Sequence, residues 1–210
     1  MSYIHRWIDR KAPWTLLLLH GTGGDENDLL TLAEAVAPGW NVLSPRGNVL
    51  EHGVVPRFFA RKAEGVFDMD DLAARTAEMA AFVEGSAAAY GFDRGRVAAL
   101  GYSNVANLAA SLLLTHPGGL AGAALLRPMV DQRQTAPVAG SLDGVPVLIA
   151  AGAHDRMIPR AGTSLLSRYL DEAGAEVTTH AHSGGHELAQ GDIAAASAFF
   201  GEDHFRGRRR

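Results

Sequence analysis

Residues 98–107 read Ala-Ala-Leu-Gly-Tyr-Ser-Asn-Val-Ala-Asn, and this stretch decides the fold. An apolar run over residues 97–100 stops at Gly101, and Ser103 follows two residues later. A long stretch rich in alanine and leucine, with helical character, comes next. The order therefore predicts a strand, a sharp turn and a helix, with a serine at the tip of the turn.

This layout matches the first four positions of the motif Gly-x-Ser-x-Gly, in which a strained turn lifts a serine hydroxyl clear of a sheet edge. Such a turn also leaves the backbone N–H of the next residue, here Asn104, facing the place where an oxyanion would form. Val105 replaces the second glycine, and its branched side chain must find room or push the turn outward. A Gly-x-Ser tripeptide is common, but its strand-to-helix context favours Ser103 as a nucleophile.

Length and composition favour a single α/β domain over residues 1–205. The chain has 210 residues, enough for a sizeable core, and no cysteine, which excludes disulfides and a thiol nucleophile. The formal charge of −4 argues against general binding to nucleic acid. Apolar runs such as residues 16–19 are too short to cross a bilayer, so we expect a cytoplasmic protein without stable membrane insertion. Residues 206–210 form a basic tail that is predicted to be disordered.

Strands and helices are expected to alternate along the whole chain. Continuous apolar runs are typical of strands that are covered on both faces, as in a parallel sheet. The expected strands cover residues 4–8, 14–19, 40–44, 97–102, 121–126, 145–151 and 176–182. The expected helices cover residues 25–36 with Asp25 as the N-cap, 68–90, 104–115, 159–174 and 191–200, and residues 47–67 are expected to form one long loop. This alternation predicts a mostly parallel, doubly wound sheet with helices on both faces.

A serine hydroxyl needs a base to remove its proton, and that base is usually a histidine oriented by a buried carboxylate. In doubly wound sheets, functional groups gather outside the carboxyl ends of the strands. Asp155 follows the strand expected at 145–151, and His186 follows the strand expected at 176–182, after two glycines. We therefore predict that Ser103, Asp155 and His186 come together. Their order along the chain is the one expected of α/β-hydrolases.

Other interpretations of these residues stay open. Asp155 could simply cap the following helix, and Asp131 is a rival acid. His180 and His182 compete with His186, but they lie on the expected strand itself. The three histidines are a weak metal candidate, because their spacing matches no standard zinc pattern and no acidic ligand accompanies them. We therefore expect no metal site.

An oxyanion needs a second hydrogen-bond donor, and the loop that begins His20-Gly21-Thr22-Gly23 follows the first central strand. We expect the backbone N–H groups of Thr22 and Asn104 to form the oxyanion hole, although the glycines could simply make a tight turn. His20 and His154 adjoin strand ends and either line the pocket or make structural hydrogen bonds. A phosphate-binding loop is disfavoured because no Gly-Lys-Ser/Thr follows.

Four motifs occur in order along residues 14–200: His20-Gly21-Thr22-Gly23-Gly24-Asp25-Glu26, Gly101-Tyr102-Ser103-Asn104, the turn at Asp155, and Gly184-Gly185-His186. Together they resemble the phospholipase/carboxylesterase family of α/β-hydrolases, which includes small bacterial carboxylesterases and acyl-protein thioesterases. The resemblance implies Ser103 as nucleophile, Asp155 as acid and His186 as base, with the N–H groups of Thr22 and Asn104 as oxyanion donors. It also implies that no cofactor is needed, that no large lid domain is present and that the protein is a homodimer. Val105 departs from the glycine that is usual in this family.

The predicted reaction is cleavage of carboxylic esters of small or medium acyl groups through an acyl-serine intermediate. A thioesterase or lysophospholipase with the same three residues stays open, as does a non-catalytic member of the fold that binds a small molecule in the same cleft. Phe58, Phe59 and Met129 are expected to wall an apolar acyl pocket, unless they only pack within their loops. Arg57 is expected to bind a carboxylate or phosphate of the substrate, or to pair with a nearby surface acid.

Overall fold

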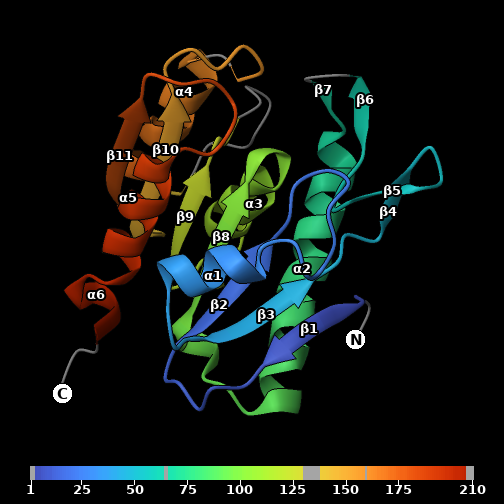
Figure 1. The fold of residues 1–210 in the computed structure, drawn as a ribbon, viewed down its shortest axis with the longest axis vertical. Helices are drawn as coiled ribbons and strands as arrows, with labels where there is room; N and C mark the ends of the chain where they lie inside the picture. The colour runs from blue at the N-terminus through green and yellow to red at the C-terminus, as the bar shows by residue number, and fades with distance from the viewer. Residues whose placement is uncertain (1–2, 64–65, 130–137, 159, 207–210) are drawn as a thin grey trace.

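The computed structural model describes residues 3–63, 66–129, 138–158 and 160–206. A seven-stranded sheet lies at its centre, with the strand order β1-β3-β2-β8-β9-β10-β11 (Figure 1). β1 pairs antiparallel with β3 at one edge, and the other neighbouring strands of this sheet pair in parallel. The predicted mostly parallel α/β sheet is therefore confirmed. The strands are β1 (His5–Ile8), β2 (Thr15–Leu19), β3 (Asn41–Pro45), β8 (Val97–Tyr102), β9 (Gly122–Leu126), β10 (Pro146–Gly152) and β11 (Glu176–His182).

The central strands are buried along their whole length, as their unbroken apolar runs predict. Every residue of β2, β3 and β9 is buried. Because successive side chains of a strand point to opposite faces, Leu17 and Leu19 pack on one side of the sheet while Leu16 and Leu18 pack on the other. The sheet therefore separates two apolar cores.

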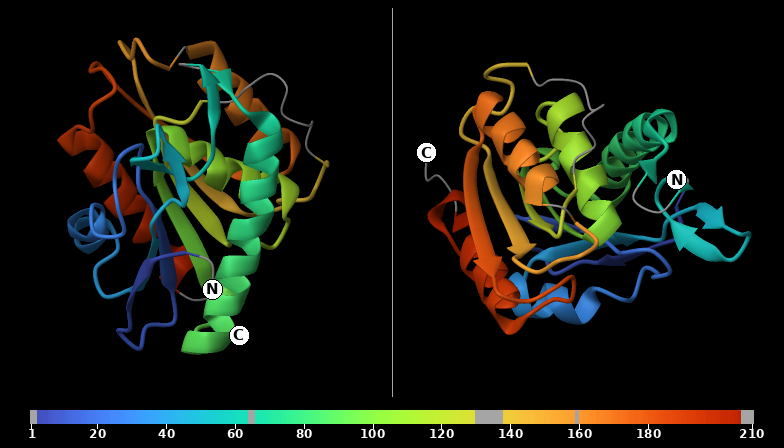
Figure 2. Two further views of the ribbon diagram at one scale, coloured as in Figure 1. Left: turned by 90° about the vertical axis from the view of Figure 1, so that its right-hand side faces the viewer. Right: turned by 90° about the horizontal axis from the view of Figure 1, so that it is seen from above.

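Helices cover both faces of the sheet (Figure 2). α2 (Met69–Tyr90), α3 (Ala106–Thr115) and α4 (Arg160–Glu172) pack over one core, while α1 (Leu30–Val36) and α5 (Gln190–Phe200) pack over the other. The short α6 (Asp203–Arg206) adds Phe205 to the second core, next to the stacked rings of Trp14 and Trp40. Two helical layers on one sheet make the fold doubly wound, and no insertion of domain size interrupts it within the described ranges.

Local capping explains which helix boundaries could be read from the sequence. α2 begins as predicted, because the Asp68 side chain accepts a hydrogen bond from the backbone N–H of Asp71, and it ends at Gly91, which has a φ of 74°. The helix predicted from residue 25 is wrong at its start, because α1 begins only at Leu30. The carboxylate of Asp25 instead accepts the N–H of Asn27 and closes a local turn.

Residues 47–67 are not the single long loop that their lack of periodicity suggested. They contain β4 (Val49–Glu51) paired with β5 (Val55–Arg57), and β6 (Arg61–Ala63) paired with β7 (Val66–Phe67). Strands of two or three residues are too short to show a period-two alternation, so the sequence pattern could not reveal them.

The structure describes only the first residue of the tail that was predicted to be disordered. Arg206, the first residue of the predicted disordered tail, is the last residue of α6. Residues 207–210 lie outside the described part, as does Asp131.

No helix within the described ranges combines the length and apolar character that crossing a bilayer would require.

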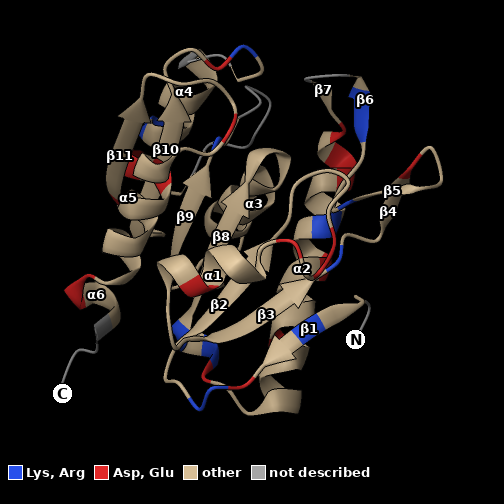
Figure 3. Cartoon of the chain, in the orientation of Figure 1, with Lys and Arg blue, Asp and Glu red and all other residues tan. Residues whose placement is uncertain are grey.

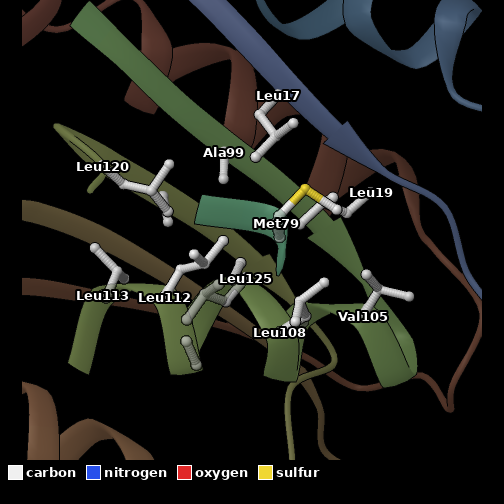
Figure 4. Packing of buried hydrophobic residues seen from close by; sticks show 14 of the residues in the cluster. Leu17, Leu19, Met79, Ala99, Val105, Leu108, Leu112, Leu113, Leu120 and Leu125 are labelled. Carbon is white, nitrogen blue, oxygen red and sulfur yellow. The ribbon is translucent and has the colours of Figure 1, made fainter. Parts of the chain in front are cut away.

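The turn from β8 into α3 is tight. A Cβ atom on Gly101 would lie only 2.9 Å from Cα of Ala106, so the two backbones meet where no side chain fits. Val105 finds room inside the core: it has a φ of −87° and is 1% exposed. Figure 4 shows its side chain at the start of α3, close to Leu19 of β2. The valine therefore adds to the core and does not push the turn outward.

Replacing Gly101 by alanine should lower the free energy of unfolding by about 1–3 kcal/mol, because the added methyl group forces the turn open. Gly85→Ala is the matched control, since a Cβ atom at Gly85 in α2 meets nothing within 4 Å. That control should raise the free energy of unfolding by about 0.5–1 kcal/mol, as alanine favours a helix interior over glycine. Urea unfolding of both variants measures the contrast, and equal shifts would show that the close approach at Gly101 costs nothing.

Candidate active site

Ser103 lies at the carboxyl end of β8 with a left-handed backbone. Its φ is 62°, a conformation that non-glycine residues rarely adopt and that marks a strained turn. Ser103 begins the 3₁₀ turn Ser103–Val105, which leads directly into α3. Sequence and structure therefore agree that a serine lies at the tip of a strained strand-to-helix connection.

The structure brings Ser103, His186 and Asp155 together in one hydrogen-bonded chain. Oγ of Ser103 lies 2.8 Å from Nε2 of His186, and Nδ1 of His186 lies 2.8 Å from Oδ2 of Asp155. Because an ionised carboxylate can only accept, Nδ1 must carry the proton that is donated to Asp155. Nε2 is then the acceptor for the hydroxyl proton of Ser103. This arrangement can move a proton from the alcohol to the imidazole.

Asp155 holds the turn after β10 as well as the histidine. Its Oδ1 accepts the backbone N–H groups of Met157 at 2.8 Å and Ile158 at 3.0 Å, while Oδ2 faces His186. Burial raises the pKa of the Asp155 carboxyl, but the hydrogen bonds from His186 and from the two N–H groups outweigh burial and hold that pKa below its usual value. The carboxylate is thus ionised, and its role in the turn does not compete with its contact to the histidine.

Hydrogen bonds from two side chains hold the loop that carries His186. The hydroxyl of Tyr102 donates to the backbone carbonyl of His186 at 3.1 Å, and Nη2 of Arg127 donates to the carbonyl of Glu187 at 2.9 Å. The loop also passes so close to β10 that a side chain at Gly152 would collide with the carbonyl of Gly185. The position of the imidazole is therefore set by backbone contacts on both sides of it.

Arg127 and Asp192 form a buried ion pair that sequence reasoning missed. Nη1 and Nη2 of Arg127 donate to the two carboxylate oxygens at 3.1 and 2.6 Å, and both side chains are 0% exposed. Arg127 directly follows β9, and Asp192 lies in the first turn of α5, so the pair ties the sheet edge to the helix after the His186 loop. The signal was available, because Arg127 follows a buried strand at the same edge as Asp155 and His186.

The other candidate histidines do not join Ser103. His182, at the end of β11, contacts Arg127 and lies 3.5 Å from Asp192, and Nε2 of His180 lies 3.8 Å from the same carboxylate. His154 contacts the carbonyl of Ser183 through Nδ1. Among the described residues, no cluster of three or more His, Cys, Asp or Glu side chains has the arrangement of a metal site.

His20 makes structural hydrogen bonds. Its Nδ1 lies 2.7 Å from the carbonyl of Gly21, and its Nε2 accepts the backbone N–H of Gly47 at 2.9 Å. The ring is 1% exposed. Burial lowers the pKa of His20, which favours the neutral ring that can accept from Gly47. His20 therefore joins the loop after β2 to the loop after β3.

The two expected oxyanion donors lie beside Ser103. Thr22 and Asn104 both line the same cavity as Ser103 and His186. In the part of the chain that the structure describes, the Thr22 N–H has no hydrogen-bond acceptor. Asn104 is the second residue of a 3₁₀ turn, where an N–H group has no acceptor within the turn. Neither N–H group has a backbone acceptor among the described residues, which leaves both available to an oxygen atom.

This cavity has a volume of about 610 Å³ and has both apolar and basic walls. Its apolar walls come from Phe67, Met129, Met157 and Ile158, and its basic walls come from Arg57, Arg61 and Arg156. The sequence predicted Met129 and Arg57 at the pocket. It did not assign Phe67, Arg61 or Arg156 to the pocket, because they lie far from Ser103 in the sequence and reach the cavity through the β-hairpins and the turn after β10.

The prediction that Phe58 and Phe59 wall the pocket is wrong. Both side chains are 0% exposed, and neither lines the cavity. Phe58 packs 4.7 Å from the ring of His20, and Phe59 packs edge-on against Phe67 at 5.2 Å. Arg57 pairs with a nearby acid, which is the second of the two roles expected for it: its Nη1 lies 3.1 Å from the carboxylate of Glu51.

Comparison with known proteins shows the family of this chain, although no family model matches it. The chain is 44% identical over 191 residues to a Bacillus subtilis (strain 168) protein named "Putative hydrolase MhqD", covering 89% of this chain and 92% of the relative. It belongs to the phospholipase/carboxylesterase family of α/β-hydrolases.

Solved structures of this family superpose closely on the chain. The crystal structure of the Bacillus cereus carboxylesterase has a TM-score of 0.87 and 46% identity, covering 93% of this chain and 92% of that one. A carboxylesterase from Mesorhizobium loti has a TM-score of 0.85 and 34% identity, with 93% of each chain covered. The α/β-hydrolase fold of this phospholipase/carboxylesterase family member is therefore shared with proteins named as carboxylesterases.

Because His20 is buried and neutral, we expect the free energy of unfolding to fall in mild acid. Its folded-state pKa lies below its ordinary value of 6.5, so the unfolded chain binds more protons and the free energy of unfolding falls as pH drops below that value. His20→Asn should flatten this dependence between about pH 7 and about pH 5, where carboxylates contribute little. His154→Asn, at an exposed position, should keep the wild-type slope. Chemical unfolding across this range measures all three proteins, and equal slopes would contradict the assignment.

Proposed function

We propose that this protein is a serine hydrolase that cleaves carboxylic esters of small or medium acyl groups through an acyl-serine intermediate. The observation that carries the proposal is the chain of two 2.8 Å contacts from the Ser103 hydroxyl through His186 to Asp155. Hydrogen-bonded serine, histidine and carboxylate groups are the arrangement that activates a hydroxyl for attack on a carbonyl.

In the proposed first step, Oγ of Ser103 attacks the ester carbonyl carbon while Nε2 of His186 takes the hydroxyl proton. Asp155 stays ionised and stabilises the imidazolium that forms. The carbonyl oxygen becomes an oxyanion between the N–H groups of Thr22 and Asn104, and each such donor lowers the barrier by roughly 3 kcal/mol. The bond to the leaving alcohol then breaks as His186 returns the proton to the alcohol oxygen.

In the second step, water repeats the sequence on the acyl-serine. His186 takes a proton from the water, the hydroxide oxygen attacks the acyl carbon, and the same two N–H groups hold the second oxyanion. Collapse releases the carboxylic acid, and the proton returns to Oγ of Ser103. No group outside the described site is needed to balance either step.

Three observations support the choice of substrate class. Two of the relatives with solved structures, from Bacillus cereus and Mesorhizobium loti, are named as carboxylesterases. The cavity beside Ser103 holds about 610 Å³ and has apolar walls from Phe67 and Met129, which suits a short or medium acyl group. No domain-sized insertion covers this cavity within the described ranges, so a lid of the kind used at lipid surfaces finds no counterpart there.

Replacing Ser103 by alanine should lower kcat for ester hydrolysis by about 10³-fold or more while leaving the circular dichroism spectrum unchanged. A fluorophosphonate should add one label to the wild type and none to this variant, as measured by intact mass, because only an activated serine reacts. Ser164→Ala, at an exposed serine of α4, is the matched control and should label fully. Undiminished hydrolysis by Ser103→Ala would remove the nucleophile assignment, and an unlabelled wild type would favour a non-catalytic binding protein.

The lining of the cavity predicts a preference among acyl groups. With p-nitrophenyl esters of increasing length, kcat/KM should rise from acetate to a medium chain and fall steeply by palmitate, because a long chain extends past the apolar walls onto the arginine side chains. Thioesters with the same acyl groups provide the comparison for the leaving group. A maximum at palmitate, or a consistently higher kcat/KM for thioesters, would replace the proposed substrate class with a lipid or thioester.

A further inference from the structure

The cavity beside Ser103 has an uneven charge distribution. Arg57, Arg61 and Arg156 line it, and no Asp or Glu does so among the described residues. The whole chain has the opposite balance, with 23 acidic residues against 19 lysines and arginines. The composition of the chain therefore does not explain why three arginines, and no described acidic residue, line this cavity.

Glu51 balances only part of this charge. Its carboxylate accepts from Nη1 of Arg57 at 3.1 Å and from Nε of Arg61 at 2.7 Å, so one anion lies between two guanidinium groups. The hydrogen bond from Arg61 is the largest of several contributions that hold the pKa of Glu51 below its usual value, so this carboxylate is ionised. The three side chains together keep one surplus positive charge.

Hydrogen-bonding capacity is also left over in this group. Nε of Arg57 donates to the carbonyl of Phe59 and Nη1 donates to Glu51, which leaves Nη2 without an acceptor in the part of the chain described. Arg61 uses Nε and Nη2 for Glu51, and its Nη1 likewise has no acceptor there. The Arg57 side chain is only 3% exposed, so its guanidinium is already fixed before any substrate arrives.

Arg156 supplies the second surplus charge from a different part of the fold. It follows Asp155 in the turn after β10, whereas Arg61 lies on β6, whose basic residues are marked in Figure 3. Arg156 is exposed and has no ion pair with any residue that the structure describes. Two segments far apart in the sequence thus each bring to the same cavity one positive charge that no described residue balances.

We propose that the esters bound here carry a second group that is an ionised carboxylate, held by Arg61 and Arg156 with Nη2 of Arg57 beside them. This inference rests on the proposed ester hydrolysis. A guanidinium fork matches the two oxygens of a carboxylate, as the contact of Arg61 with Glu51 already illustrates.

The test compares two esters of equal size. One is the mono-p-nitrophenyl ester of glutaric acid, and the other is its uncharged isostere, in which an isopropyl group replaces the free carboxylate. The ratio of their kcat/KM values reports the contribution of the negative charge. We expect the wild type to favour the charged ester, and added salt to lower the ratio because it screens the partly exposed arginines.

Arg61→Gln and Arg156→Gln should each lower this ratio roughly 3- to 10-fold, mainly through KM of the charged ester. Arg168→Gln removes the same charge from an exposed position on α4, outside the cavity, and should keep the wild-type ratio. A wild-type ratio near one, or a ratio that Arg61→Gln and Arg156→Gln leave unchanged while both esters are still cleaved, overturns the anion site and leaves the hydrolase proposal intact.

A binding measurement separates the two proposals if neither ester is cleaved. In that case the proposed hydrolysis fails, and calorimetric titration of the wild type with glutarate decides the anion site by itself. Binding that is lost in the double variant Arg61→Gln/Arg156→Gln supports the site, and absence of binding to the wild type overturns it. Inorganic phosphate binding more tightly than glutarate would overturn the choice of a carboxylate.

Discussion

The position of Ser103 depends on one steric constraint, the contact between the backbones of β8 and α3 at Gly101. A Cβ atom there would lie 2.9 Å from Cα of Ala106, so the chain can turn this sharply only because glycine has no side chain. The turn places Ser103 at a φ of 62°, which costs on the order of 1–3 kcal/mol. The burial of Val105 in the core beneath the turn offsets a cost of this size, since a fully buried valine contributes about 1.5–3 kcal/mol. The strain at the serine is thus held in place by packing a few residues away.

The histidine is positioned by a different kind of interaction. Arg127 and Asp192 bury two full charges, and burial of an ion pair returns little net stability because desolvation cancels most of the attraction. The pair instead fixes the position of the loop that carries His186. Arg127 also donates to the carbonyl of Glu187, which directly follows His186. Once buried, neither charge can be left without the other, because an unpaired buried charge costs about 3–5 kcal/mol. The loop of His186 therefore has few alternative positions with comparable free energy.

The sequence predicted the parts of the molecule that local rules govern. The buried strands, the capped helix α2 and the convergence of three distant residues at one sheet edge all follow from apolar runs, capping residues and parallel topology. The errors lie where tertiary packing decides. Phe58 and Phe59 read as pocket residues because they occupy a loop-like stretch, but that stretch folds back on the core and buries them, and Phe67 reaches the cavity. The Arg127–Asp192 pair joins residues 65 positions apart, a separation that no periodicity can reveal.

The remaining loops at this edge are joined to one another by polar contacts that cross between strands. His20 accepts the N–H of Gly47, Arg46 donates to Glu26 through two nitrogens, and the N–H of Gly23 donates to the carbonyl of Pro56. Each contact ties the loop after β2 to the segment after β3, and Thr22 lies between these tied residues. Donors that are fixed before a reaction stabilise a developing charge without reorganising, whereas water must reorient to do the same. The rigidity of this edge is therefore the physical reason why the free N–H of Thr22 suits the oxyanion role that we propose for it.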